Sequence, residues 1–204
     1  MWNTLYKVIS LLFVVSLLSA CMGSGATTPI RYYLVEPVEY SGGSLKAVRP
    51  LSIEILDLHI PQYLERFQIA SRSSESRLEF SDDNQWGENL RKNLLRTMAR
   101  NLSRQLSTID LGTPLNRSSS LPDYRVQIHI DQFEQDIDDK VKLMARWQLT
   151  SGKESKSLGV FSAELASEQV LEKDNYDQMI LSMRQLYGEL SERIADSIIA
   201  QENN

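Results

Sequence analysis

The sequence predicts an α/β fold of α+β character: a mixed, largely antiparallel sheet with two long amphipathic helices packed on one face. Two apolar stripes at helical spacing predict the helices, one within residues 86–106 and one within residues 176–198. Alternating apolar and polar residues predict one-sided strands, most clearly at 124–130 and 141–149. Because these elements bury their apolar sides together, the other face of the sheet is left for solvent or for a partner.

The first strand is predicted at Arg31–Val35, where Pro37 ends it, and a turn is expected at Ser41–Ser44. In the second strand, apolar residues alternate first at Leu51, Ile53 and Ile55, and then at Leu56, Leu58 and Ile60. A phase change of one residue moves the buried side chains to the other face of a strand. We therefore expect a bulge or a strand end near residues 55–56.

A hairpin and the first helix are expected next. Phe67–Ala70 and Arg77–Phe80 form two short strands, joined by a polar loop at 71–76. The helix is expected to begin after N-cap candidates at 81–84 and to run for about twenty residues. Its apolar stripe is Trp86, Leu90, Leu94, Met98, Leu102 and Leu106. Its opposite face is basic, which fits either a solvated face or a docking surface, with Arg91, Lys92, Arg96, Arg100 and Arg104.

The C-terminal half is predicted to be a meander followed by a helix. After a loop at 107–122, strands are expected at 124–130, 141–149 and 158–169, with an acidic turn at 136–139. Asp174 or Asn175 is placed to cap the last helix, whose apolar stripe runs from Tyr176 to Ile198.

The N-terminus reads as a lipoprotein leader. Lys7 precedes an uninterrupted run of apolar and weakly polar residues at 8–18. The small residues Ser19 and Ala20 stand before Cys21, which is the only cysteine of the chain. The run would form a helix of roughly 16 Å, about half of a bilayer core. We expect a signal peptide at 1–20, a lipidated cysteine and flexible tether at 21–29, and a single periplasmic domain at 30–204.

The pattern resembles that of bacterial lipoproteins, in which the cysteine becomes the lipid-bearing first residue of the mature chain. Two or more acyl chains give a stable membrane anchor, whereas one does not. Lipoproteins that this pattern resembles usually carry an Asp directly after the cysteine when they are retained in the inner membrane. Met22 stands at that position here, which favours the outer membrane of a Gram-negative bacterium. No cofactor is expected apart from the covalent lipid on Cys21.

Composition and spacing argue against other classes. The formal net charge is −5, and no basic run with interleaved aromatic residues suggests nucleic-acid binding. His59 and His129 lack metal-ligand spacing, and the carboxylates at 136–139 lack the glycine and distal glutamate of a calcium loop. No G-x-S-x-G elbow is present. We expect that the protein is not an enzyme.

Several segments together resemble the PqiC/YmbA family of transport auxiliary lipoproteins. They are the Arg31-Tyr32-Tyr33-Leu34 strand, the Ile60–Arg66 segment, the Trp86 to Leu90 region and the C-terminal helix with Tyr176, Met183, Leu186, Leu190 and Ile194. The resemblance implies a non-catalytic outer-membrane lipoprotein that works with an inner-membrane-anchored MCE-domain protein to move lipids or other hydrophobic molecules between the two membranes. A homo-oligomer is also expected, because one domain of this size does not encircle a conduit.

The candidate partner-binding residues are Pro61, Tyr63, Leu64, Arg66 and Trp86. Tyr63 and Arg66 are residue types that anchor protein interfaces. The alternative is structural: Pro61 ends a strand, Tyr63 and Leu64 fill the core edge, Arg66 pairs with a carboxylate and Trp86 plugs the rim of the core. Two other functions remain open, namely a structural or regulatory outer-membrane lipoprotein that contacts another envelope complex, and a periplasmic hydrolase.

Overall fold

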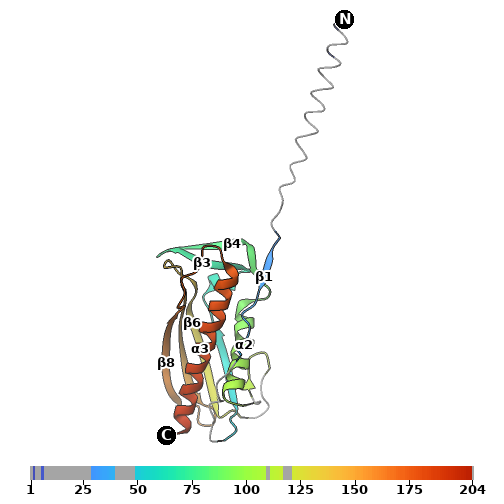
Figure 1. Cartoon of the computed structure of the whole chain (residues 1–204). Coiled ribbons are helices and arrows are strands. Elements are labelled where there is room, and N and C mark those ends of the chain that lie inside the picture. Colours follow the sequence, from blue (N-terminus) through green and yellow to red (C-terminus); the bar gives the residue numbers. More distant parts are fainter. Residues whose placement is uncertain are drawn as a thin grey trace.

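The computed structural model describes residues 29–39, 49–108, 111–116 and 121–203, together with Trp2 and Tyr6. Within these residues, eight strands form one mixed sheet, and two long helices lie on one side of it (Figure 1). This arrangement confirms the predicted fold class. In chain order the elements are β1 (Arg31–Tyr33), β2 (Ile53–His59), η2 (Gln62–Glu65), β3 (Gln68–Ser74), β4 (Arg77–Trp86), α2 (Leu90–Gln105), β5 (Leu111–Gly112), β6 (Tyr124–Gln135), β7 (Val141–Ser151), β8 (Ser157–Ala166) and α3 (Tyr176–Glu202).

Strand β6 joins the two parts of the sheet. Along one edge it pairs with β7 in antiparallel, and β7 pairs with β8 in the same sense. Along its other edge it pairs in parallel with β2 over its first half and meets β3 near its end, at Ser71 and Gln135. The strand order is β1-β4-β3-β6-β2-β5, with β7 and β8 beyond the other edge of β6. The β3–β4 hairpin therefore crosses one end of the fold, beside the start of α3 (Figure 1).

The predicted phase change in β2 is confirmed as a bulge. The pairing of β2 with β6 shifts register between Ile55 and Asp57. Ile55 and Leu58 are buried on the inner face, while Leu56 is 44% exposed. The bulge absorbs one residue, so both halves of the strand present their apolar side chains to the same core.

The hairpin and the start of α2 differ from the prediction. The turn occupies only residues 75–76, and β4 continues to Trp86, which the sequence analysis had placed in the helix. Two interactions hold this segment as a strand: β1 pairs with residues 84–86, and the Trp86 amide donates to the Phe67 carbonyl at 2.7 Å. The helix begins at Leu90, where the Asn89 side chain caps it by accepting from the Lys92 amide.

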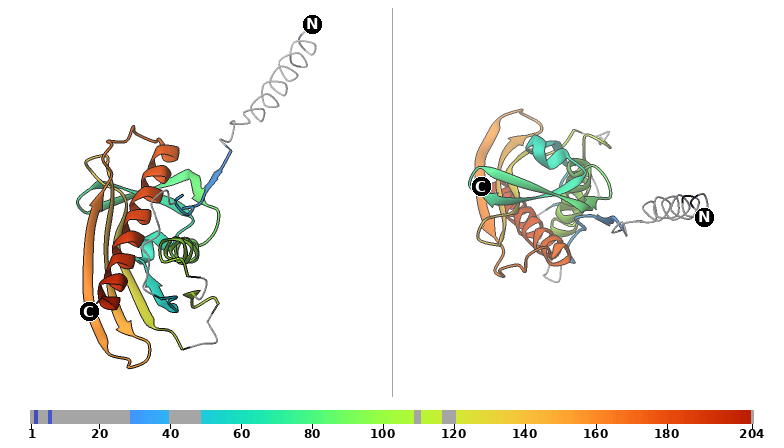
Figure 2. Two further views of the ribbon diagram at one scale, coloured as in Figure 1. Left: turned by 60° about the horizontal axis from the view of Figure 1, so that its bottom comes forward. Right: turned by 90° about the horizontal axis from the view of Figure 1, so that it is seen from above.

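The core fills the space between the sheet and the two helices, which lie on the same side of the sheet (Figure 2). As predicted, β6 and β7 bury alternate residues and expose the others. Aromatic side chains connect the layers. Tyr187 of α3 stacks on Phe133 of β6 with ring centroids 5.8 Å apart and donates to the Leu94 carbonyl of α2. The Trp147 indole of β7 donates to the Ser197 hydroxyl of α3 at 3.1 Å.

The predicted cap of the last helix is confirmed at Asn175, whose side chain accepts from the Gln178 amide. The basic face of α2 is largely engaged in intramolecular contacts. Arg91 pairs with Asp57 at 3.5 Å and Arg96 with Glu88, while Arg104 donates to the Val38 carbonyl. These contacts, made by side chains that stay partly exposed, favour a solvated face over a free docking surface.

Candidate functional site

The Pro61–Arg66 segment folds as η2, a single 3-10 turn that follows β2 directly. Pro61 stands at its N-cap position and its carbonyl accepts from the Leu64 amide at 3.0 Å. A proline fits here because its fixed φ suits an extended entry into a turn. Leu64 is 2% exposed and belongs to the core, as the structural interpretation predicts.

Tyr63 turns toward β6 and forms the centre of a buried polar cluster. Its hydroxyl donates to Glu134 Oε2 at 2.7 Å, and the Phe133 amide donates to the same oxygen at 3.0 Å. Arg72 of β3 donates to the other oxygen, Oε1, at 2.9 Å from Nη2 and 3.2 Å from Nε. The Glu134 side chain has no exposed surface. The carboxylate is therefore held by a hydroxyl, an amide and a guanidinium at once.

This cluster locks η2, the hairpin and β6 together. Burial, together with the neighbouring Glu134 carboxylate, raises the pKa of the Tyr63 hydroxyl well above its ordinary value. The hydroxyl is therefore protonated and donates to Glu134 throughout the physiological pH range. Breaking a buried ion pair by removing one partner costs about 3–5 kcal/mol, so Glu134 and Arg72 are mutually dependent.

Glu134 and Arg72 were not among the residues singled out from the sequence. Glu134 lies on the side of β6 that is otherwise exposed or half-buried, beyond a register shift between Ile130 and Gln132. It is buried only because η2 and the hairpin, more than sixty residues earlier, close over it. No periodic pattern within the β6 sequence indicates that contact.

Arg66 does not play the predicted ion-pair role. Its guanidinium lies over the Phe80 ring of β4, 4.5 Å from the ring centroid, which is a cation–π contact. Among the described residues, no carboxylate forms an ion pair with it. The neighbouring Phe67 is 64% exposed, so this corner presents an aromatic ring and a guanidinium to its surroundings.

Trp86 fills the core at the end of β4. It is 3% exposed, which agrees with a structural plug at the core rim rather than a ligand platform. Its indole Nε1 is buried and, within the described structure, lacks a hydrogen-bond partner. Hence, of the five candidates, Leu64 and Trp86 are core residues, Pro61 and Tyr63 shape the turn, and Arg66 alone is exposed.

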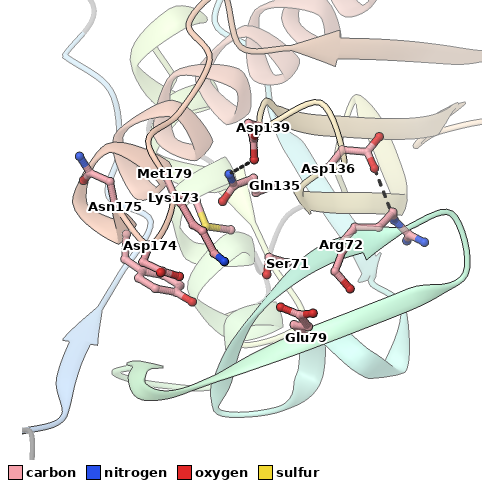
Figure 3. A pocket seen from close by; sticks show the side chains of 12 residues that line it. Ser71, Arg72, Glu79, Gln135, Asp136, Asp139, Lys173, Asp174, Asn175 and Met179 are labelled. Atoms are coloured by element: carbon pink, nitrogen blue, oxygen red, sulfur yellow. Dashed lines mark hydrogen bonds and ion pairs between the residues drawn. The ribbon is translucent and has the colours of Figure 1, made fainter.

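A polar cleft of about 300 Å³ opens under the hairpin, between the β6–β7 turn and the start of α3 (Figure 3). Asp136, which lines the cleft, is paired with two cations. Arg72 Nε lies 3.8 Å from Asp136, and Lys142 Nζ lies 2.6 Å from Asp136 and 3.1 Å from Asp138. Burial opposes ionisation of Asp136, but the Lys142 hydrogen bond, the Ile137 amide and the positive charges of Lys142 and Arg72 together outweigh it and lower the pKa of that carboxyl. The acidic turn thus braces the β6–β7 hairpin.

The two histidines lie opposite each other on β2 and β6, with ring centroids 5.5 Å apart on the outer side of the sheet. His59 is exposed and His129 is half-buried. In the part of the chain that the structure describes, no group of three His, Cys, Asp or Glu side chains is placed to hold a metal ion.

The segment after β1 lies between α2 and α3, and its backbone is held by side chains of both helices. Asn93 Oδ1 accepts from the Val35 amide at 2.8 Å, and Thr97 donates to the Val35 carbonyl at 2.7 Å. One turn further along α2, Asn101 Oδ1 accepts from the Val38 amide at 3.2 Å. These polar residues recur every four positions and so form one stripe of α2.

The α3 side completes this arrangement. Arg184 donates two hydrogen bonds to the Pro37 carbonyl, at 2.8 and 3.1 Å. A Cβ on Gly188 would lie 2.6 Å from Val38 Cγ1, so the glycine is what lets Val38 approach the helix. We refer to Asn93, Thr97, Asn101, Arg104, Arg184 and Gly188 as the N-terminal clamp. The clamp fixes the chain directly behind the predicted tether.

Cys21 and most of the predicted signal peptide and tether lie outside the described residues. Within the described residues, no helix has the length and apolar character needed to cross a bilayer.

Comparison with known proteins assigns the family. Residues 32–195 match the model of a family described as ABC-type transport auxiliary lipoprotein component. This span is most of the chain, so the protein belongs to this family, and the predicted resemblance is confirmed. The family is one of lipoproteins that assist ABC-type transport, which implies a place in the cell envelope and an auxiliary role in transport. No curated protein matches the chain closely enough to add to this assignment.

Two solved structures have a similar fold. A crystal structure described as that of an uncharacterized protein is 20% identical, with a TM-score of 0.64, and the match covers 83% of this chain and 99% of that chain. Protein XCC0632 from Xanthomonas campestris, of the family DUF330, is 10% identical, with a TM-score of 0.64 and coverage of 86% and 97%. At these identities the likeness concerns the fold alone.

Proposed function

We propose that this protein is an outer-membrane-anchored periplasmic lipoprotein that serves as a non-catalytic component of an MCE-type system moving lipids or other hydrophobic molecules between the inner and outer membranes. The observation that supports this most is the family match over 32–195, combined with a single cysteine directly behind a leader. Lipid on Cys21 supplies the anchor, and the folded domain supplies the contacts with the transport machinery.

The N-terminal clamp supports the anchoring part of the proposal. A lipid tether positions a domain only if the chain behind the tether is fixed to the fold. Here the backbone of Val35 and Val38 is held by α2, and the backbone of Pro37 is held by α3. A pull on Cys21 is therefore transmitted to the two helices that cover the sheet.

We propose the outer membrane as the destination because Met22, and not the Asp typical of lipoproteins retained in the inner membrane, follows Cys21. The test is membrane fractionation of the full-length precursor expressed in a Gram-negative host. Wild type should sediment with the outer membrane, whereas Cys21→Ala should be absent from that fraction. Ser24→Ala, which alters the tether but leaves the leader and Cys21 intact, is the matched control and should behave as wild type. Cys21→Ala protein that still sediments with the outer membrane would contradict the anchor.

The partner is tested by cross-linking intact cells and purifying the lipoprotein through a C-terminal tag. An MCE-domain protein anchored in the inner membrane should be recovered with wild type. Repeated recovery of a different envelope complex, such as a cell-wall synthase, would replace the transport role with a structural or regulatory one. The same samples, analysed by native mass spectrometry, report the proposed homo-oligomer, and a strictly monomeric species would count against it.

A further inference from the structure

The end of the fold from which the predicted tether leaves is fixed by β1. Strand β1 pairs with the last residues of β4, at the end that the hairpin crosses (Figures 1 and 2). The C-terminal end of α3 lies at the opposite end of the fold (Figure 1). Cys21 precedes Pro29 by only eight residues, which reach at most about 29 Å when stretched. As a flexible chain they have a root-mean-square length of about 16 Å.

Large apolar side chains are exposed at this same end. Ile30 is 45% exposed, Tyr32 is 65% exposed and Phe67 is 64% exposed. The backbone of Trp86 connects their segments. It pairs with Tyr33 of β1 on one side, and its amide donates to the Phe67 carbonyl on the other. Phe67 is thus two strand spacings, about 10 Å, from β1.

Two arginines are next to these residues in the chain. Arg31 and Arg66 are both exposed, and each is the chain neighbour of one of the exposed aromatic residues. Aromatic side chains favour the interface between lipid headgroups and acyl chains. Arginine binds phosphate groups through its planar set of donors. The combination of residue types fits a phospholipid surface.

We propose that Ile30, Arg31, Tyr32, Arg66 and Phe67 form a bilayer-contact patch that seats on phospholipid once the chain is anchored. The inference rests on the proposed lipidation of Cys21. The anchor keeps Pro29 within about 29 Å of the lipid surface, so a contact that is weak by itself becomes effectively intramolecular. The patch fixes the orientation of the domain, with the hairpin end against the membrane and the C-terminal end of α3 pointing away from it.

The experiment measures which end of the domain approaches lipid. The full-length lipoprotein, purified from membranes, is reconstituted into vesicles of phosphatidylethanolamine and phosphatidylglycerol that contain brominated acyl chains. Phe67→Trp places a fluorescent probe in the patch. Val160→Trp is the matched control, because Val160 is 70% exposed on β8 near the opposite end of the sheet. The parent protein gives the background from Trp86 and Trp147, which are buried.

The bromine should quench the Phe67→Trp fluorescence at least twofold more than the Val160→Trp fluorescence. Adding Arg31→Gln and Arg66→Gln should reduce quenching at Phe67→Trp toward the level of the control. Equal quenching at the two probes, or none at either, would overturn the patch. Absent quenching together with cross-links between patches of two molecules would assign this surface to a second copy instead.

Flotation of the same vesicles separates this inference from the proposed function. Protein that floats with the vesicles while its Phe67→Trp probe is not quenched retains the anchor and refutes the patch. Wild-type protein that carries no lipid and does not float refutes the anchor, and the patch with it.

Discussion

The hydroxyl of Tyr63 donates a 2.7 Å hydrogen bond to the fully buried carboxylate of Glu134, which lies 71 residues further along the chain. The same carboxylate accepts from Arg72 of the hairpin. One buried charge thus joins η2, β3 and β6, three elements that backbone pairing connects only at Ser71 and Gln135. The Pro61–Arg66 segment, for which the sequence allows either an interface or a structural role, therefore helps to close the fold.

Removing the Tyr63 hydroxyl should weaken this closure. Tyr63→Phe keeps the ring but leaves Glu134 with one donor fewer, and a hydrogen bond to a charged group contributes about 1.5–3 kcal/mol. We expect the free energy of unfolding, measured by urea denaturation, to fall by about 2 kcal/mol. Tyr32→Phe is the control and should change stability little, because Tyr32 is 65% exposed. Equal stability of Tyr63→Phe and wild type would show that the bond contributes nothing net.

Removing the charge of Glu134 should cost more. Glu134→Gln leaves the partly buried Arg72 without its nearest counter-charge, so a loss of about 3 kcal/mol is expected. A double-mutant cycle with Arg72→Met isolates the pair. The two losses should be strongly non-additive, with the double variant more stable than their sum predicts. Additive losses would mean that the two residues do not interact.

The N-terminal clamp depends on the missing side chain of Gly188. In Gly188→Ala the new Cβ would lie 2.6 Å from Val38 Cγ1, so either Val38 or α3 has to move. We expect a loss of about 1–3 kcal/mol in urea unfolding and faster hydrogen exchange at the Val35 amide. Gly87→Ala is the matched control, because its Cβ would meet no atom closer than 3.5 Å. Unchanged exchange at Val35 in Gly188→Ala would contradict the clamp.

The bulge in β2 predicts opposite results at two leucines that are two residues apart. Leu58 is 1% exposed, so Leu58→Ala should destabilise the protein by about 2–5 kcal/mol. Leu56 is 44% exposed, and Leu56→Ala should change stability by less than about 0.5 kcal/mol. Thermal or urea unfolding of the two variants distinguishes the bulge from a regular strand, in which both side chains would lie on one face and be buried alike.

Stability should decrease in acid partly through Asp123, at the end of the fold away from the hairpin. Burial alone would raise the pKa of this carboxyl, but hydrogen bonds from Arg49, the Ser52 amide and Lys153 outweigh it and lower the pKa from 3.8 to about 2. A lowered pKa in the folded state means that the ionised group stabilises the fold above about pH 4. This stabilisation is lost as the pH falls through about 2.

The corresponding variant is Asp123→Asn. At pH 7 it should be less stable than wild type by about 2 kcal/mol, as a shift of nearly two pKa units implies. The difference should shrink between pH 4 and pH 2, because wild type then loses the same interaction. Urea unfolding across this range is the measurement. A difference that stays constant down to pH 2 would assign the loss at pH 7 to packing rather than to charge.

The sequence predicts most of this fold because its strongest signals are local. The alternation in β6 and β7, the bulge in β2 and the Asn175 cap all depend on neighbouring residues. The predicted start of α2 was wrong because Trp86 continues the apolar helical stripe in the sequence, whereas its conformation is set by pairing with β1. That pairing joins residues more than fifty positions apart and leaves no local pattern.

The candidate site is harder to predict from the sequence than the fold for the same reason. Tyr63 stood out as an aromatic residue in a turn, but its partner Glu134 is buried by elements that are remote in sequence. A sequence pattern does mark the N-terminal clamp. Asn93, Thr97 and Asn101 are polar residues at intervals of four within the apolar half of α2, and such a stripe indicates a polar chain held against the helix. Buried polar side chains at this spacing need partners, and the extended segment 35–38 supplies them.

The proposed function depends on the anchoring of this domain in the outer membrane through Cys21. It is tested most directly by the intact mass and N-terminal peptide of the protein purified from separated outer membranes. We predict a mature chain that begins at Cys21, with a diacylglyceryl group on its sulfur and an acyl group on its amine. A chain that retains residues 1–20, or one that begins elsewhere with an unmodified Cys21, would contradict it.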